Sequence, residues 1–149
     1  MLRLVVSMIV FALAAIAAVA AEKSIEELKK ELSSADLHAQ HKLYAELARQ
    51  QVEVANDLYT AGDVPQAEAA VNEVVAYAEK AREIGLKSGK KLKKTEITLR
   101  KASRRLADVG RTLSVEYRPH VEAAVARLDD VRNELLEKMF GLKESKEKR

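Results

Sequence analysis

Two histidines three residues apart are the side chains in this sequence best suited to bind a metal. His38 and His41 fall in a segment predicted to be helical, where positions three apart share one face. Neutral imidazoles bind zinc, but a zinc site needs three or four ligands, which Asp36, Glu46 or His120 would have to complete. We therefore expect both histidines to be ordinary side chains at the surface or the edge of the core, with no metal or other cofactor.

Motifs for catalysis are missing from the sequence. There is no cysteine, no G-x-S-x-G, no glycine-rich phosphate loop, no H-E-x-x-H and no calcium-binding loop. The carboxylate pairs Glu26-Glu27 and Asp129-Asp130 are adjacent in sequence. Neighbours in a helix point about 100° apart, so neither pair forms an acid/base dyad. The sequence predicts a protein that is not an enzyme.

Basic side chains are concentrated in one predicted helix. Leu86 to Arg111 contains ten bases and two acids, a net charge of +8, whereas Glu22 to Gly85 carries −6. In the interpretation that we favour, the basic helix lies beside the acidic ones and forms weak exposed ion pairs. In the alternative, the helix binds an anionic partner such as lipid headgroups or an envelope polymer. The residues that would bind it are Lys90, Lys91, Lys93, Lys94, Arg100, Lys101, Arg104 and Arg105.

Residues 1–21 have the pattern of an export signal. Arg3 is followed by an uncharged apolar run that ends in the small residues Ala18-Val19-Ala20-Ala21. A basic start, an apolar middle and an A-x-A end are typical of a secretory signal peptide. We expect cleavage after Ala20 or Ala21 and a periplasmic or extracellular protein, so nucleic acid is not an expected partner. The alternative is an uncleaved anchor in the inner membrane, because the run is about long enough to span a bilayer.

The remaining sequence is predicted to be all-α. It is rich in Ala, Leu, Glu, Lys and Arg, which favour helices, and the whole chain has only five glycines and two prolines. Residues 22–35 are expected to form a short N-terminal helix and a linker, with Ser24 capping the helix. Asp36 and Asp63 are expected to cap the two helices that follow. An antiparallel up-down bundle of four helices is expected in residues 36–142, followed by a charged, disordered tail at 143–149.

Apolar residues recur at spacings of three and four along each predicted long helix, as expected for helices packed nearly parallel or antiparallel to one another. In the third helix this stripe is Leu92, Thr95, Leu99, Ala102, Leu106, Val109 and Leu113, and in the fourth it is Val121, Ala124, Leu128, Val131 and Leu135. Gly85 and Gly89 are expected to separate the second and third helices. The alternative is a three-helix arrangement in which one long central helix runs through both glycines.

One predicted hairpin, at about residues 51–78, resembles a tetratricopeptide unit. The resemblance rests on Val54-Ala55, Leu58, Gly62-Asp63 and Ala67, because in that family a small residue lets two helices approach and a Gly-Asp turn joins them. No second copy follows about 34 residues later, so a stacked array is not expected. The A-G-D hairpin in an exported Ala/Glu/Lys-rich chain also resembles exported bacterial helical proteins of unknown function.

The sequence thus predicts a non-catalytic, extracytoplasmic helical bundle. We expect it to act by protein–protein interaction or self-association, with another envelope protein or itself as the partner. Two alternatives remain open. One is an envelope-surface binder that holds anionic lipid or polymer on its basic helix. The other is a periplasmic chaperone or metal-responsive helical protein.

Overall fold

The computed structural model describes residues 22–141, so the predicted signal peptide (1–21) and charged tail (143–149) lie outside the described residues. Within residues 22–141 the chain is all-α, which confirms the fold class predicted from composition. No helix in this part of the chain is long and apolar enough to cross a membrane. The helices are α1 (Ile25–Leu32), α2 (Leu37–Thr60), α3 (Val64–Ser88), α4 (Leu92–Thr112) and α5 (Arg118–Phe140).

The first three helices begin at the capping residues predicted from sequence. Ser24 and Glu27 form a reciprocal capping box at the start of α1. The Asp36 carboxylate accepts a hydrogen bond of 2.8 Å from the Ala39 amide and so caps α2. Asp63 caps α3 in the same way, directly after the predicted turn.

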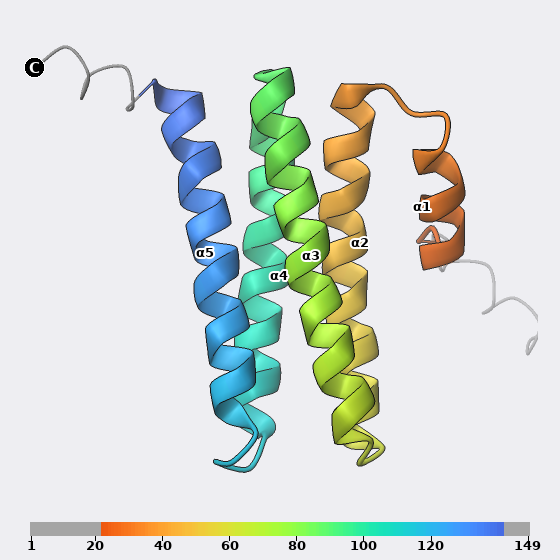
Figure 1. The fold of residues 1–149 in the computed structure, drawn as a ribbon, viewed down its shortest axis with the longest axis vertical. Coiled ribbons are helices and arrows are strands. Elements are labelled where there is room, and N and C mark those ends of the chain that lie inside the picture. The colour runs from red at the N-terminus through yellow and green to blue at the C-terminus, as the bar shows by residue number, and fades with distance from the viewer. Residues whose placement is uncertain (1–21, 142–149) are drawn as a thin grey trace, which may run out of the picture.

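The four long helices form two hairpins, α2–α3 and α4–α5, which pack against each other (Figure 1). The pairs in close contact are α2 with α3, α4 with α5, α2 with α4, and α3 with α5. α3 and α4 follow each other in sequence but make few contacts, because they lie across the bundle from each other. α1 packs on α2 alone among the described helices. The starts of α2 and α4 and the ends of α3 and α5 therefore share one end of the bundle (Figure 1).

The predicted apolar stripes form the core between these helices. Leu99 and Leu106 of α4, and Leu128 and Leu135 of α5, are fully buried. The α2–α3 hairpin contributes mainly alanine and valine, and these small side chains let its two helices approach closely. Leu113 was predicted to continue the apolar stripe of α4, and this was wrong. α4 ends at Thr112, and Leu113 has an extended backbone and is half-buried.

α3 and α4 are separate helices, so the three-helix alternative with one long central helix is wrong. The break is at Gly89, which has a left-handed backbone (φ +64°) and ends α3. α3 continues through Gly85, which was expected to help separate the helices. Gly85 is buried, and a Cβ placed there would lie 3.1 Å from Leu92 Cδ2, so this glycine permits close packing instead.

Candidate anion-binding site

The two candidate metal ligands have different partners and different exposure. His41 is fully buried, and its Nδ1 lies 2.6 Å from Thr95 Oγ1 of α4. His38 is partly buried, and its Nδ1 lies 2.5 Å from Ser88 Oγ at the end of α3. Among residues 22–141 no group of three or more His, Cys, Asp or Glu side chains is placed to hold a metal ion. The expectation of a position at the surface or the edge of the core was wrong for His41, which is fully buried between α2 and α4.

His120 does not approach the other two histidines. It lies near the start of α5, at the opposite end of the bundle from the start of α2 (Figure 1). Its Nε2 is 3.3 Å from the backbone oxygen of Glu68. His41 Nε2 is buried without a hydrogen-bond partner in the described structure, and burial lowers the pKa of His41. His41 is therefore neutral at neutral pH.

Part of the predicted basic surface is paired with acidic residues, although α4 lies beside α2 alone of the two acidic helices, and not beside both as the favoured interpretation had expected. Arg105 of α4 donates to both carboxylate oxygens of Glu53 on α2, at 2.6 and 3.0 Å. The hydrogen bond from Arg105 lowers the pKa of Glu53. Arg100 lies 3.7 Å from Glu96, one turn earlier on α4. These two arginines are held within the fold rather than left for a partner.

The lysines at the start of α4 have no such partners. Within residues 22–141, no ion pair involves Lys90, Lys91, Lys93 or Lys94, and the same is true of Lys101 and Arg104 farther along α4. Lys91, Lys93 and Lys94 line a shallow groove of about 330 Å³ together with Ile97 and Lys42 of α2. We call these four lysines, Lys42, Lys91, Lys93 and Lys94, the lysine cluster.

Lys42 was missed from the sequence because it lies on a different helix. It comes from α2, whose overall composition is acidic, about fifty residues before the rest of the cluster. It joins the cluster because α2 and α4 lie side by side. Only the packing of the two hairpins could reveal this position.

The acidic side chains beside the lysine cluster already have partners. A neighbouring groove between α1, α2 and α4 is lined by Lys42, Lys91 and Lys94, and also by Asp36, Glu31 and Glu46. Asp36 caps α2, and the hydrogen bond from Ala39 lowers the pKa of Asp36. The other two acids are in ion pairs, whereas the charge of Asp36 interacts with that of Lys91, so one local acid offsets part of the positive charge of the cluster.

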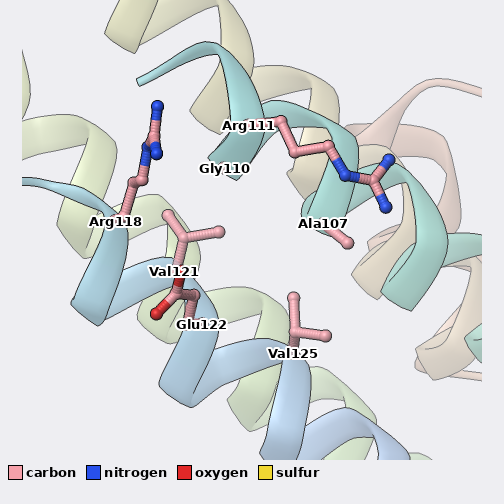
Figure 2. Close-up of a pocket in the computed structure, with 7 residues that line it drawn as sticks. All are labelled: Ala107, Gly110, Arg111, Arg118, Val121, Glu122 and Val125. Carbon is pink, nitrogen blue, oxygen red and sulfur yellow. The ribbon is translucent and has the colours of Figure 1, made fainter. Parts of the chain in front are cut away.

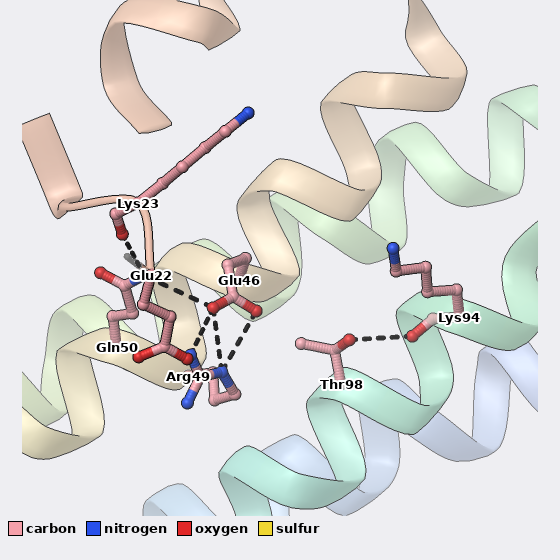
Figure 3. Close-up of polar contacts among 7 residues, drawn as sticks. All are labelled: Glu22, Lys23, Glu46, Arg49, Gln50, Lys94 and Thr98. Atoms are coloured by element: carbon pink, nitrogen blue, oxygen red, sulfur yellow. Dashed lines mark hydrogen bonds and ion pairs between the residues drawn. The ribbon is translucent and has the colours of Figure 1, made fainter. Parts of the chain in front are cut away.

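These ion pairs tie the N-terminal segment to α2. Glu31 lies 2.5 Å from Lys23, and Glu46 accepts hydrogen bonds from Arg49, which also pairs with Glu22. Figure 3 shows the contacts of Glu46 with Arg49 and Gln50 on one side and the Lys94 side chain extending from α4 on the other. In that view the only dashed contact of Lys94 is from Thr98 Oγ1 to its backbone oxygen, at 3.0 Å.

The first turn of α4 adds positive potential to the lysine cluster. Its N-cap residue, Lys91, has a left-handed backbone (φ 57°) and no side chain caps the helix. The first amide groups of a helix carry a partial positive charge, which a capping carboxylate would normally offset. Here the helix terminus and the lysines favour the same kind of ligand, one with negative charge.

A second depression, between α4 and α5, is less suited to an anion. It has a volume of about 270 Å³, and Val121, Val125 and Glu122 line it together with two arginines (Figure 2). Arg111 forms an ion pair with Asp108, and Arg118 Nε donates a hydrogen bond of 2.9 Å to the backbone oxygen of Leu113. Both arginines already have partners, and the carboxylate of Glu122 lines the same depression, so an anion is not favoured there.

The sequence also missed a polar network at the α4–α5 contact. Glu96 is buried and its Oε1 lies 3.1 Å from Arg132 Nη2, while Arg132 also pairs with Asp129 at 3.0 Å. Asp129 accepts a hydrogen bond of 2.8 Å from Ser103 Oγ, so it links the two helices. Glu96 and Ser103 are seven residues apart, each one position after a residue of the predicted stripe. That spacing is the signal that could have placed them on the buried face.

Comparisons with protein-family models, curated proteins and solved structures found no significant match to this chain.

Proposed function

We propose that this protein is a non-catalytic helical protein that acts outside the cytoplasm by binding an anionic partner on the lysine cluster. The observation that carries the proposal is the contrast in pairing: Arg100 and Arg105 of α4 are held by acids, while the cluster has no ion pair within residues 22–141. An array of cations without partners is attractive to a ligand with several negative charges.

Placement outside the cytoplasm rests on the signal-like segment at residues 1–21, as does the expectation that nucleic acid is not the partner. We propose a cleaved signal and a periplasmic or extracellular location, with an inner-membrane anchor as the alternative. The tetratricopeptide-like hairpin at about 51–78 is proposed as scaffold, since the candidate site lies on α4 and on the first turns of α2.

Pairing of apolar stripes between chains has less support than binding through the lysines. Leu99 and Leu106 of α4 and Leu128 and Leu135 of α5 are already buried inside one chain. A protein partner or a second copy would therefore have to use other residues than these. The lysine cluster gathers four cations without ion pairs within residues 22–141 around one groove.

Titration of the purified protein with dextran sulfate, a soluble polyanion, tests this proposal. We expect binding at low salt that weakens steeply as the ionic strength rises from about 0.05 to 0.5 M. Lys91→Glu together with Lys94→Glu should lower the affinity at least about tenfold, because each lysine near an anionic surface contributes on the order of 1 kcal/mol.

Two double variants with the same change in net charge serve as controls. Lys29→Glu with Lys30→Glu changes exposed residues of α1, and Lys101→Glu with Arg104→Glu changes exposed residues farther along α4. Both should retain affinity within about threefold if binding is local to the cluster. Equal losses in all three double variants would show that only net charge matters, and would overturn the proposed site.

A further inference from the structure

We infer that the anionic partner is a membrane surface rich in anionic phospholipid, and that the protein docks on it with one end of the bundle. This inference rests on the proposed function, because it assigns a partner to the lysine cluster. The end in question contains the starts of α2 and α4 and the end of α5 (Figure 1). We call it the basic end.

Two large apolar side chains are exposed at the basic end. Leu37 is the first residue of α2 and is 48% exposed, and Phe140 is the last residue of α5 and is 69% exposed. Exposed Leu and Phe gain free energy when they enter the apolar edge of a bilayer. A soluble polyanion would offer them no such environment, so they favour a lipid surface as the partner.

The groove of the lysine cluster suits an amphiphilic ligand. Its surface is almost entirely carbon, supplied by Ile97 and the lysine stems. Lysine can lay its methylene stem along apolar groups while its ammonium group remains in a polar environment. This arrangement matches the boundary between anionic headgroups and acyl chains.

The opposite end of the bundle lacks this combination. Val115 is 75% exposed there, in the connection between α4 and α5, but its neighbour is Glu116. Asp63, which caps α3, lies at the same end. The two ends thus differ in charge while both expose an apolar residue, and Val115 provides a matched control.

Co-sedimentation with vesicles tests the inference. The vesicles are phosphatidylcholine with about one-third phosphatidylglycerol, and vesicles of phosphatidylcholine alone are the charge control. We expect binding to the anionic vesicles only. Leu37→Ser with Phe140→Ser should weaken it about tenfold or more, because two apolar side chains no longer enter the bilayer. Val115→Ser should leave it unchanged.

Binding of the same variants to dextran sulfate separates this inference from the proposed function. If Leu37→Ser/Phe140→Ser binds both vesicles and dextran sulfate as well as the unmodified protein does, the membrane inference is overturned and the lysine site stands. If the protein binds dextran sulfate but not anionic vesicles, the membrane inference is likewise overturned and the lysine site stands. If Lys91→Glu/Lys94→Glu retains full affinity for dextran sulfate, the proposed function itself fails. Loss of vesicle binding alone in the Leu37/Phe140 variant supports the inference.

Discussion

The two halves of α4 carry similar positive charge but use it differently. Around the first half, Lys91, Lys93 and Lys94 have no ion pair within residues 22–141 and line an open groove. In the second half, Arg105 is held by Glu53 of α2, and Arg111 is held by Asp108. Net charge per segment would rank both halves alike as binding surfaces.

The difference follows from residue type and position. The planar guanidinium group of arginine can meet both oxygens of a carboxylate, as Arg105 meets those of Glu53, while lysine carries a strongly hydrated point charge on a flexible stem. The second half of α4 also faces the acidic middle of α2. The lysines face Lys42 of α2 instead, so several cations without an ion pair within residues 22–141 lie around one groove there.

The largest effect is expected where α4 is held in the core. Leu106→Asp should destabilise the fold by more than about 3 kcal/mol, because it removes a fully buried leucine and buries an unpaired charge. A loss of this size would unfold much of a small domain. Circular dichroism during thermal unfolding measures the effect, and Val115→Asp is the exposed control. An unchanged melting temperature for Leu106→Asp would contradict the packing of α4.

The next largest effect is expected at Glu96, the buried carboxylate in the first half of α4. Glu96→Gln should cost about 1–3 kcal/mol, because Arg132 would lose a charged partner in a partly desolvated position. The side chains are 6% and 19% exposed, so solvent screens this pair little. Urea unfolding measures the loss, and Glu73→Gln on the exposed surface of α3 makes the same charge change. Equal stability of the two variants would show that Glu96 does not anchor α4 to α5.

A pH dependence is expected from His41, which packs against the first half of α4. Burial lowers the pKa of His41, so the unfolded chain binds a proton more readily than the folded one. Stability should be constant above the ordinary histidine pKa of about 6.5 and fall as the pH drops through it, by at most about 1.4 kcal/mol per pH unit. The charges of Lys42 and His38 also lower the pKa of His41, whereas the Lys90 backbone and Asp36 raise it.

Urea unfolding between about pH 8 and pH 5 measures this dependence. The variant His38→Gln/His120→Gln should retain the slope, since it leaves His41 in place. His41→Gln should reduce the slope. A flat profile in the double variant would assign the effect to His38 or His120 and contradict the prediction.

The smallest effect is expected at the exposed pair of the second half. Glu53→Gln should cost no more than about 0.5 kcal/mol, because Arg105 and Glu53 are 44% and 49% exposed and water screens their attraction. The same variant leaves Arg105 without its partner and so tests the comparison directly. We expect tighter binding of dextran sulfate, by less than about threefold. No gain at all at low salt would show that pairing does not limit which cations bind.

Local patterns predicted most of the secondary structure. The capping residues Ser24, Asp36 and Asp63 begin helices as expected, and the buried leucines of α4 and α5 follow the predicted spacing. These features depend on neighbours within a few residues, which the sequence displays directly. Gly85 was misjudged because its place in a continuous helix depends on Leu92 and Leu135, against which it packs.

What the sequence determined by itself was the all-α fold, the helix starts and the residues that form the core, because helical spacing and capping are local properties. Which positive charges are free was decided only by the tertiary structure. Lys42 joins the cluster, Glu53 neutralises Arg105, and Glu96 is buried against Arg132, all because of how the hairpins pack. Coulomb interactions depend on distance in space, and these partners lie between 36 and 52 residues apart or on different helices.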